Sequence, residues 1–339
     1  MNAAYLCALS AAAFLQLAGS AQADPVAEFF KGKVVNILIP AGPGGRTHDY
    51  ATLASQHLGR FIPGNPRVIV QSMPGAGGIR VTLYSYNVAP KDGTAILFPP
   101  DNIAFSQLMT PSEAKYDATR FSWLGAISQK RGVLVIRGDR GVRTTDDMRK
   151  VELFMASSGS GSQTEVYPML ANSLLGTKMK IVRGFEGSGT TIIAIESGEM
   201  HGTVNTWQYW RRRPDWFKSG FLLAMLQFGL GREPELPDVP NIIELVESED
   251  GKQLVRFVTS FGPIGRGLTL PPGVPPDRAN ALKRAFQEML KDETFLAQAN
   301  KVDLPIDALT GSQVDQVVAG VVRTPPDVVA RARSTLYSK

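Results

Sequence analysis

The chain has 339 residues, of which 43% are hydrophobic, and its formal net charge at pH 7 is +5. This is the composition of an ordinary globular protein, and the length is enough for two domains of about 150 residues each. The positive charge is spread along the chain, and the one basic run, Arg211–Arg213, is too short for the stripe that nucleic-acid binding needs, so we expect no nucleic-acid partner.

Residues 1–23 have the features of an export signal. An alanine-rich apolar run is followed by Ala21-Gln22-Ala23, an A-x-A cleavage site, directly before Asp24. We therefore expect cleavage after Ala23. The single cysteine, Cys7, lies inside this segment. The mature chain would then contain no cysteine, which excludes disulfides, thiol catalysis and cysteine–metal sites.

The mature chain begins with one pattern that occurs twice. A β-branched run predicts a buried strand at Val34–Ile39, followed by a glycine loop at 40–45 and a helix from about Thr47 to Leu58. The second copy is a strand at Val68–Val70, a Pro-Gly-Ala-Gly-Gly loop at 74–78 and another helix. Glycine lets the backbone approach a ligand closely, and the free N–H groups and dipole at a helix start attract negative charge. Two such loops on neighbouring parallel strands would form a paired anion site.

Both loops lack the motifs of nucleotide sites. The final glycine of G-x-G-x-x-G is replaced by Thr47 in the first loop and by Arg80 in the second, and no G-K-[ST] follows either loop. A carboxylate is therefore a better candidate than a nucleotide, although two ordinary strand-to-helix turns would give the same pattern. The candidate ligand-binding residues here are Gly42, Gly44, Gly45, Arg46, Thr47, His48, Asp49, Gly75, Ala76, Gly77 and Gly78.

The rest of the chain continues the alternation of strands and helices. We expect strands at 94–98, 121–127, 132–136, 153–156, 179–182, 201–206 and 221–228. The chain would cross into a second lobe near residue 127 and return through the last of these strands. A Ser/Gly loop at 157–162 precedes a helix, and an amphipathic pattern predicts one helix from Pro276 to about Ala299. The many strand–helix units favour an α/β fold with parallel-rich sheets.

The sequence offers no evident catalytic group. Its histidines, His48, His57 and His201, form no H-E-x-x-H motif, so we expect no metal site. No G-x-S-x-G motif occurs, and no base is placed near Ser160 or Ser162. We expect His57 at the surface or an interface, whereas His48, at a helix entrance, would either contact a bound anion or cap the helix. We therefore expect neither an enzyme nor a cofactor.

Four motifs occur in a fixed order: the two glycine loops, then Ala89-Pro90-Lys91-Asp92-Gly93-Thr94, then Leu236-Pro237-Asp238-Val239-Pro240. In this order they resemble the periplasmic solute receptors of tripartite tricarboxylate transporters, the Bug family, over essentially the whole mature chain. The resemblance implies an α/β, two-lobed periplasmic-binding-protein fold of the Venus-flytrap, type II-like class. Lobe 1 would comprise residues 24–126 and 230–339, and lobe 2 residues 127–229. It also implies a monomer in the periplasm that hands a small organic acid to an integral-membrane permease.

The resemblance further implies ligand contacts from both lobes. In this family, backbone amides and ordered waters of the two glycine loops hold carboxylates, and the matching lobe 2 segments add Ser158, Ser160, Ser162, Phe185, Asn205 and Trp207. The chain departs from the family at His48, where Asp is usual, at Ile79, where Asn is usual, and at His201, where an acidic residue is usual. Two alternatives are a secreted hydrolase or lyase that uses Ser160 or His48, and a sensor partner that presents its ligand to a signalling protein.

Overall fold

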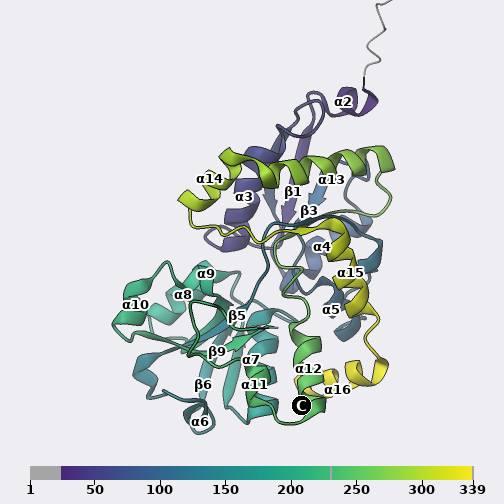
Figure 1. Ribbon diagram of the computed structural model, residues 1–339. Helices are drawn as coiled ribbons and strands as arrows, with labels where there is room; N and C mark the ends of the chain where they lie inside the picture. The colour runs from purple at the N-terminus through teal and green to yellow at the C-terminus, as the bar shows by residue number, and fades with distance from the viewer. Residues whose placement is uncertain (1–23, 230, 338–339) are drawn as a thin grey trace, which may run out of the picture.

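The structure is a computed structural model that describes residues 24–229 and 231–337. These residues form two α/β lobes, each built around one β-sheet, and helix α2 (Pro25–Phe30) lies at the outer end of the upper lobe (Figure 1). The expected export signal lies outside the described residues. Within them, no helix is both long enough and apolar enough to cross a membrane.

The first lobe surrounds a six-stranded sheet of order β11-β4-β10-β3-β1-β2. Its strands are β1 (Val34–Ile39), β2 (Arg67–Ser72), β3 (Ala95–Leu97), β4 (Ser122–Ala126), β10 (Gly267–Leu270) and β11 (Leu309–Thr310). β1 is parallel to β2 and β3 because the helices α3 (Arg46–Leu58) and α4 (Ile79–Asn87) form the crossovers between them. The β-branched run of β1 is its core, with Val35, Ile37 and Ile39 fully buried.

The second lobe surrounds a five-stranded sheet of order β7-β6-β8-β5-β9. Its strands are β5 (Gly132–Arg137), β6 (Leu153–Ser157), β7 (Met179–Arg183), β8 (Gly202–Thr206) and β9 (Leu222–Phe228). The chain enters this lobe through residues 127–131, between β4 and β5. β9 is an edge strand of this second sheet, and the chain returns to the first lobe only after it.

The expectation of parallel-rich sheets is wrong. Only four of the nine strand pairings are parallel. The reason is the chain path, because β10 runs opposite to both β3 and β4, and β5 runs opposite to both β8 and β9. Each sheet therefore keeps a parallel part, which carries the strand–loop–helix units, and an antiparallel part that belongs to the crossings between lobes.

The remaining helices cover the sheets. They are α5 (Ile103–Met109), α6 (Thr145–Met148), α7 (Gln163–Leu175), α8 (Ser188–Glu196), α9 (Trp207–Trp210), α10 (Pro214–Lys218), α11 (Ile242–Leu245), α12 (Glu249–Thr259), α13 (Pro276–Lys291), α14 (Glu293–Lys301), α15 (Gly311–Val322) and α16 (Pro326–Tyr337). Single-turn 3₁₀ helices lie at Ala76–Gly78, Ala118–Arg120 and Gly138–Arg140.

The single helix predicted from Pro276 to about Ala299 is in fact two helices, α13 and α14. Asp292 interrupts it with an extended backbone, and its carboxylate accepts the Phe295 N–H at 2.8 Å, which caps the new helix. His57 was expected at the surface or an interface, and of these two positions the surface is wrong. His57 is buried between α3 and α14, with its Nε2 atom 2.6 Å from Gln298 Oε1 and its ring edge-on to Phe295.

One hydrophobic cluster runs through both lobes. It joins Leu97 of the first sheet, Met155 of the second sheet and Phe105 of α5 to apolar residues of the C-terminal helices. α16 contacts both α7 of the second lobe and α5 of the first, and α12 packs on α7 as well (Figure 1). The predicted division of the chain at 126/127 and 229/230 stays a prediction.

Candidate functional site

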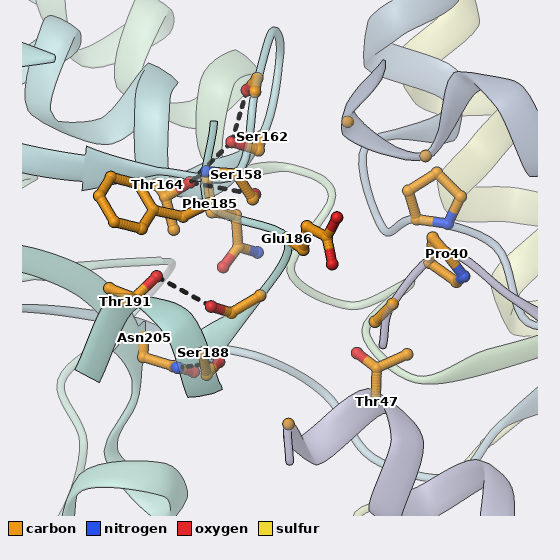
Figure 2. A pocket seen from close by; sticks show the side chains of 18 of the residues that line it. Pro40, Thr47, Ser158, Ser162, Thr164, Phe185, Glu186, Ser188, Thr191 and Asn205 are labelled. Carbon is orange, nitrogen blue, oxygen red and sulfur yellow. Dashed lines mark hydrogen bonds between the residues drawn. The ribbon is translucent and has the colours of Figure 1, made fainter. Parts of the chain in front are cut away.

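A cleft of about 550 Å³ lies between the lobes. On the first-lobe side its wall contains the first glycine loop, with Pro40 and Thr47, and the second glycine loop at 74–78. On the opposite side lie the Ser/Gly loop, the segment around Phe185 and Glu186, and the end of β8 with Asn205 (Figure 2). The two sides come from segments that are distant in the chain, since 80 residues separate Gly78 of the second glycine loop from Ser158 of the Ser/Gly loop.

Four helices of nine or more residues begin at this cleft, and none of them has a side-chain cap. Their N-cap residues are Gly45 of α3, Gly78 of α4, Ser162 of α7 and Gly187 of α8, and all four line the cavity. The first N–H groups of a helix have no partner inside the helix, so a side chain, water or a ligand accepts from them. By contrast, several helices that begin elsewhere carry a side-chain cap.

Side-chain caps are present at several helices that begin away from the cavity. α12, α14 and α15 are capped by Ser248, Asp292 and Thr310, respectively, and each of these side chains accepts a backbone N–H of the first turn. The sequence is thus able to cap its helices, and it leaves uncapped the four that point at the cleft; away from the cleft, α13 also lacks a side-chain cap, but it begins with Pro276, which has no N–H to be capped. Four positive helix ends meeting at one cavity form a strong site for a negatively charged group.

The Ser/Gly loop is held by hydrogen bonds within the loop and to Thr164 of α7. Ser158 N–H donates to Thr164 Oγ1 at 2.9 Å, and Ser162 Oγ donates to the Gly159 carbonyl at 2.7 Å (Figure 2). These bonds fix the loop at the cleft wall. Among the described residues that line the cavity there is no histidine, so neither serine has an imidazole base beside it.

Buried cations form another part of the wall. Lys130 Nζ lies 2.9 Å from Asp101 Oδ2, and Arg46 Nη2 lies 3.2 Å from Asp303 Oδ2. Burial lowers the pKa of Lys130, while the Asp101 carboxylate opposes this shift. Burial also lowers the pKa of Arg46, and the nearby Arg212 guanidinium acts in the same direction. The wall therefore favours negative charge in the cleft.

Several contacts join the lobes around the cavity. Asn102 Nδ2 donates to the Gly161 carbonyl at 2.6 Å, and Gln163 Nε2 donates to Asp101 Oδ2 at 2.6 Å. Gly77 lies so close to the Ser160 carbonyl that an added Cβ atom would collide with that oxygen. The structure is therefore a form in which the two lobes touch across the cleft.

Most of the residues selected from the sequence line this cavity. They are Gly42, Gly45, Arg46, Thr47, Gly75, Ala76, Gly77, Gly78, Ser158, Ser162, Phe185 and Asn205. Asn205 also donates from Nδ2 to Ser188 Oγ at 2.8 Å, which ties the end of β8 to the start of α8.

Five selected residues do not line the cavity: Gly44, His48, Asp49, Ser160 and Trp207. Asp49 instead forms a 3.6 Å ion pair with Arg212 across the two lobes. Trp207 begins α9, and its Nε1 donates to Glu235 at 2.8 Å, outside the cavity. Wall positions near it are taken by Tyr209 and Trp210.

Sequence reasoning missed Lys130, Arg266 and Trp210 as cavity residues. Lys130 lies in the crossing between β4 and β5, and Arg266 precedes β10. Two signals were available. Lys130 is next to an expected crossing, and crossings border the cleft in a two-lobed protein; Arg266 lies between Gly265 and Gly267 in a glycine-rich stretch.

Comparisons with known proteins were made by sequence and by structure. No family model and no curated protein matches the sequence. Solved structures do match: the periplasmic binding protein BugD has a TM-score of 0.70 and 18% identity, covering 88% of this chain and 97% of that one. MatC from Rhodopseudomonas palustris with bound malate has a TM-score of 0.67 and 20% identity, and the match covers 88% of this chain and 99% of MatC. The R. palustris protein Rpa4515 with adipate has a TM-score of 0.68 and 17% identity, and the match covers 88% of this chain and 97% of Rpa4515.

This chain has the fold of these periplasmic binding proteins. The α/β, two-lobed periplasmic-binding-protein fold that the sequence resemblance implied is thereby confirmed. In this periplasmic-binding-protein fold, the described cavity lies between the lobes, where both glycine loops and the Ser/Gly loop meet.

Proposed function

We propose that this protein is a periplasmic receptor that binds a small organic carboxylate between its lobes and delivers it to an integral-membrane permease of the tripartite tricarboxylate type. The observation that carries the proposal is the meeting of four uncapped helix N-termini at one cleft. Hydrogen bonds from backbone N–H groups to a carboxylate are charge-assisted and about twice as strong as neutral ones.

Two further findings support the proposal. Structural neighbours with this fold were solved with malate and with adipate, both organic acids. The cleft wall is also cationic, with Arg46, Lys130 and Arg266 largely buried in it. In this scheme Gly45, Gly78, Ser162 and Gly187 present backbone N–H groups, and Thr47 and Asn205 add polar side chains that orient the ligand. We propose a monomer, exported and cleaved after Ala23.

We propose binding without turnover. The serine hydroxyls at the cleft are engaged in the hydrogen bonds of their own loop. Ser160, one of the residues that the hydrolase alternative needs, lies outside the cavity wall, as does His48. Incubation of the purified protein with malate and adipate, followed by mass spectrometry, should recover both acids unchanged.

The first test compares acids with their amides. Calorimetry with malate, succinate and adipate, each beside its diamide, should show binding of at least one acid and of no amide. Equal affinity for an acid and its amide would refute the carboxylate claim. Native mass spectrometry of the protein as purified would show directly which acid it retains.

The second test uses a substitution at Gly45 to place a carboxylate inside the proposed site. The backbone of Gly45 is extended, as an aspartate N-cap requires, and an added Cβ atom would approach nothing closer than Ser188 Oγ at 3.8 Å. Gly45→Asp would place a carboxylate on the α3 N-terminus, so it should block the ligand while keeping or slightly raising the melting temperature. Gly45→Asn is the matched control, because it caps the helix without the charge and should retain more affinity. Loss of affinity that is equal in both variants would contradict the role of charge.

A further inference from the structure

Two arginines in the cleft wall bury their guanidinium groups with too few hydrogen-bond acceptors. Arg266 is 1% exposed, and its Nε atom has no partner among the described residues. Its other bonds are long, at 3.4 Å to Thr206 Oγ1 and 3.5 Å to the Gln129 carbonyl. The guanidinium lies over the ring of Tyr50, 4.5 Å from the centroid. Weak bonds of this length leave most of its donor capacity unused.

Arg46, the first residue of α3, also has a buried guanidinium with too few hydrogen-bond acceptors. It is 3% exposed, and only its Nη2 atom is bonded, to the Gln208 carbonyl and to Asp303 Oδ2. Its Nε and Nη1 atoms are buried without a partner in the part of the chain that the structure describes. Both arginines line the same cavity.

The carboxylates of the wall do not balance this charge. The ionisable residues that line the cavity are four cations, Arg46, Arg80, Lys130 and Arg266, and two anions, Asp101 and Glu186. Asp101 is already occupied by Lys130 and Gln163. Glu186 is exposed to solvent, and Arg266 forms no ion pair within residues 24–229 and 231–337. A buried guanidinium without a counter-ion is costly, and an anion that enters the cleft would remove that cost.

We infer that Arg266 and Arg46 form a side-chain anion site that binds one acidic group of the ligand, while the helix N-termini bind another. The inference rests on the proposed function and makes it more specific, because it requires a ligand with at least two acidic groups. Each guanidinium is planar and can donate two parallel hydrogen bonds to the two oxygens of one carboxylate. Arg266 sits at the carboxyl end of β8, through Thr206, which is where ligands bind in α/β sheets.

The test removes one charge from the ligand and one from the protein. Malonate, succinate, glutarate, adipate and malate would each be titrated into the protein by calorimetry, beside the corresponding monoamide. For the diacid that binds best, we expect its monoamide to bind about 100-fold more weakly, as for loss of one partner of a buried charge pair. Arg266→Gln should lower the affinity for the diacid by about the same factor and change the affinity for the monoamide by less than about threefold. The diacid affinity of Arg266→Lys should lie between those of the parent and Arg266→Gln, because lysine keeps the charge but cannot donate two parallel hydrogen bonds to one carboxylate.

Arg278→Gln is the matched control. Arg278 also stacks on an aromatic ring, that of Phe29, and donates to a carbonyl at 3.1 Å, but it does not line the cavity. Its substitution should leave the diacid affinity unchanged. If Arg266→Gln does not fold, Arg46→Gln provides the same comparison of diacid with monoamide.

The outcomes separate this inference from the proposed function. If diacid and monoamide bind the parent protein equally, or if Arg266→Gln weakens both by the same factor, the arginine site is refuted and a monocarboxylate receptor remains. If no acid binds, both the inference and the proposed function fail. A loss confined to the diacid supports the inference, since a purely structural role for Arg266 would affect both ligands.

Discussion

Gly77 allows a close approach of the two lobes, so its replacement should weaken ligand binding. It lies in the second glycine loop with φ +60°, directly against the Ser160 carbonyl of the opposite lobe. In Gly77→Ala, the left-handed backbone costs alanine about 1–2 kcal/mol, but this cost falls on open and closed forms alike. The collision of the new methyl group with Ser160 affects only the closed form. At the 1–3 kcal/mol typical of overpacking, it would lower ligand affinity roughly 5- to 150-fold.

Gly176 provides a control for backbone strain. It ends α7 with φ +70° and ψ 24°, close to the φ 60° and ψ 17° of Gly77, and an added Cβ atom would meet nothing within 4 Å. Gly176→Ala should therefore lower the melting temperature without changing affinity. Calorimetry with a bound acid and thermal unfolding would be measured for both variants. Parent-like affinity in Gly77→Ala, or an equal loss in Gly176→Ala, would refute the reasoning.

Two further predictions concern fluorescence and pH. Trp210 lines the cavity and Trp207 does not, so the emission change caused by an acid ligand should be lost in Trp210→Phe and kept in Trp207→Phe; the reverse result would contradict the placement of α9. Hydrogen bonds from the Thr294 hydroxyl and the Phe295 N–H, with Arg60 nearby, lower the pKa of Asp292 from 3.8 to about 2. A pKa that is lowered in the folded state adds stability at pH values above the unfolded pKa. The melting temperature of Asp292→Asn should therefore be below that of the parent at neutral pH, and the two should converge as the pH falls from about 4 to about 2. A difference in melting temperature that does not depend on pH would exclude this cause.

The local elements were predictable because their signals are local. The apolar run of β1, the glycine loops and the helices after them are all visible in consecutive residues, and β1 has the bounds expected. The break at Asp292 was missed because the amphipathic stripe continues across it, and only the capping bond reveals a new helix. Strand direction was mispredicted because it depends on how the chain crosses between lobes, which no single strand encodes.

The backbone part of the candidate site could be predicted, whereas the buried cations could not. Glycine directly before a helix leaves the first backbone N–H groups accessible to an anion, so Gly45 and Gly78 could be identified from the sequence alone. Arg266 has meaning only through its burial and its neighbours, Tyr50 and Thr206, which are distant in sequence. Trp207 was preferred to Trp210 because α9 was not anticipated, and one helical turn moves the cavity contact three residues along the chain.

The hydrophobic cluster that runs through both lobes has a consequence for how the protein unfolds. Because Leu97, Met155 and residues of α16 share one core, neither lobe can lose its packing without exposing apolar surface of the other. The two lobes should therefore melt together in one cooperative transition, although each has a sheet of its own. Any movement between the lobes should therefore be sliding or bending at the cleft side, because α16 contacts α7 of one lobe and α5 of the other.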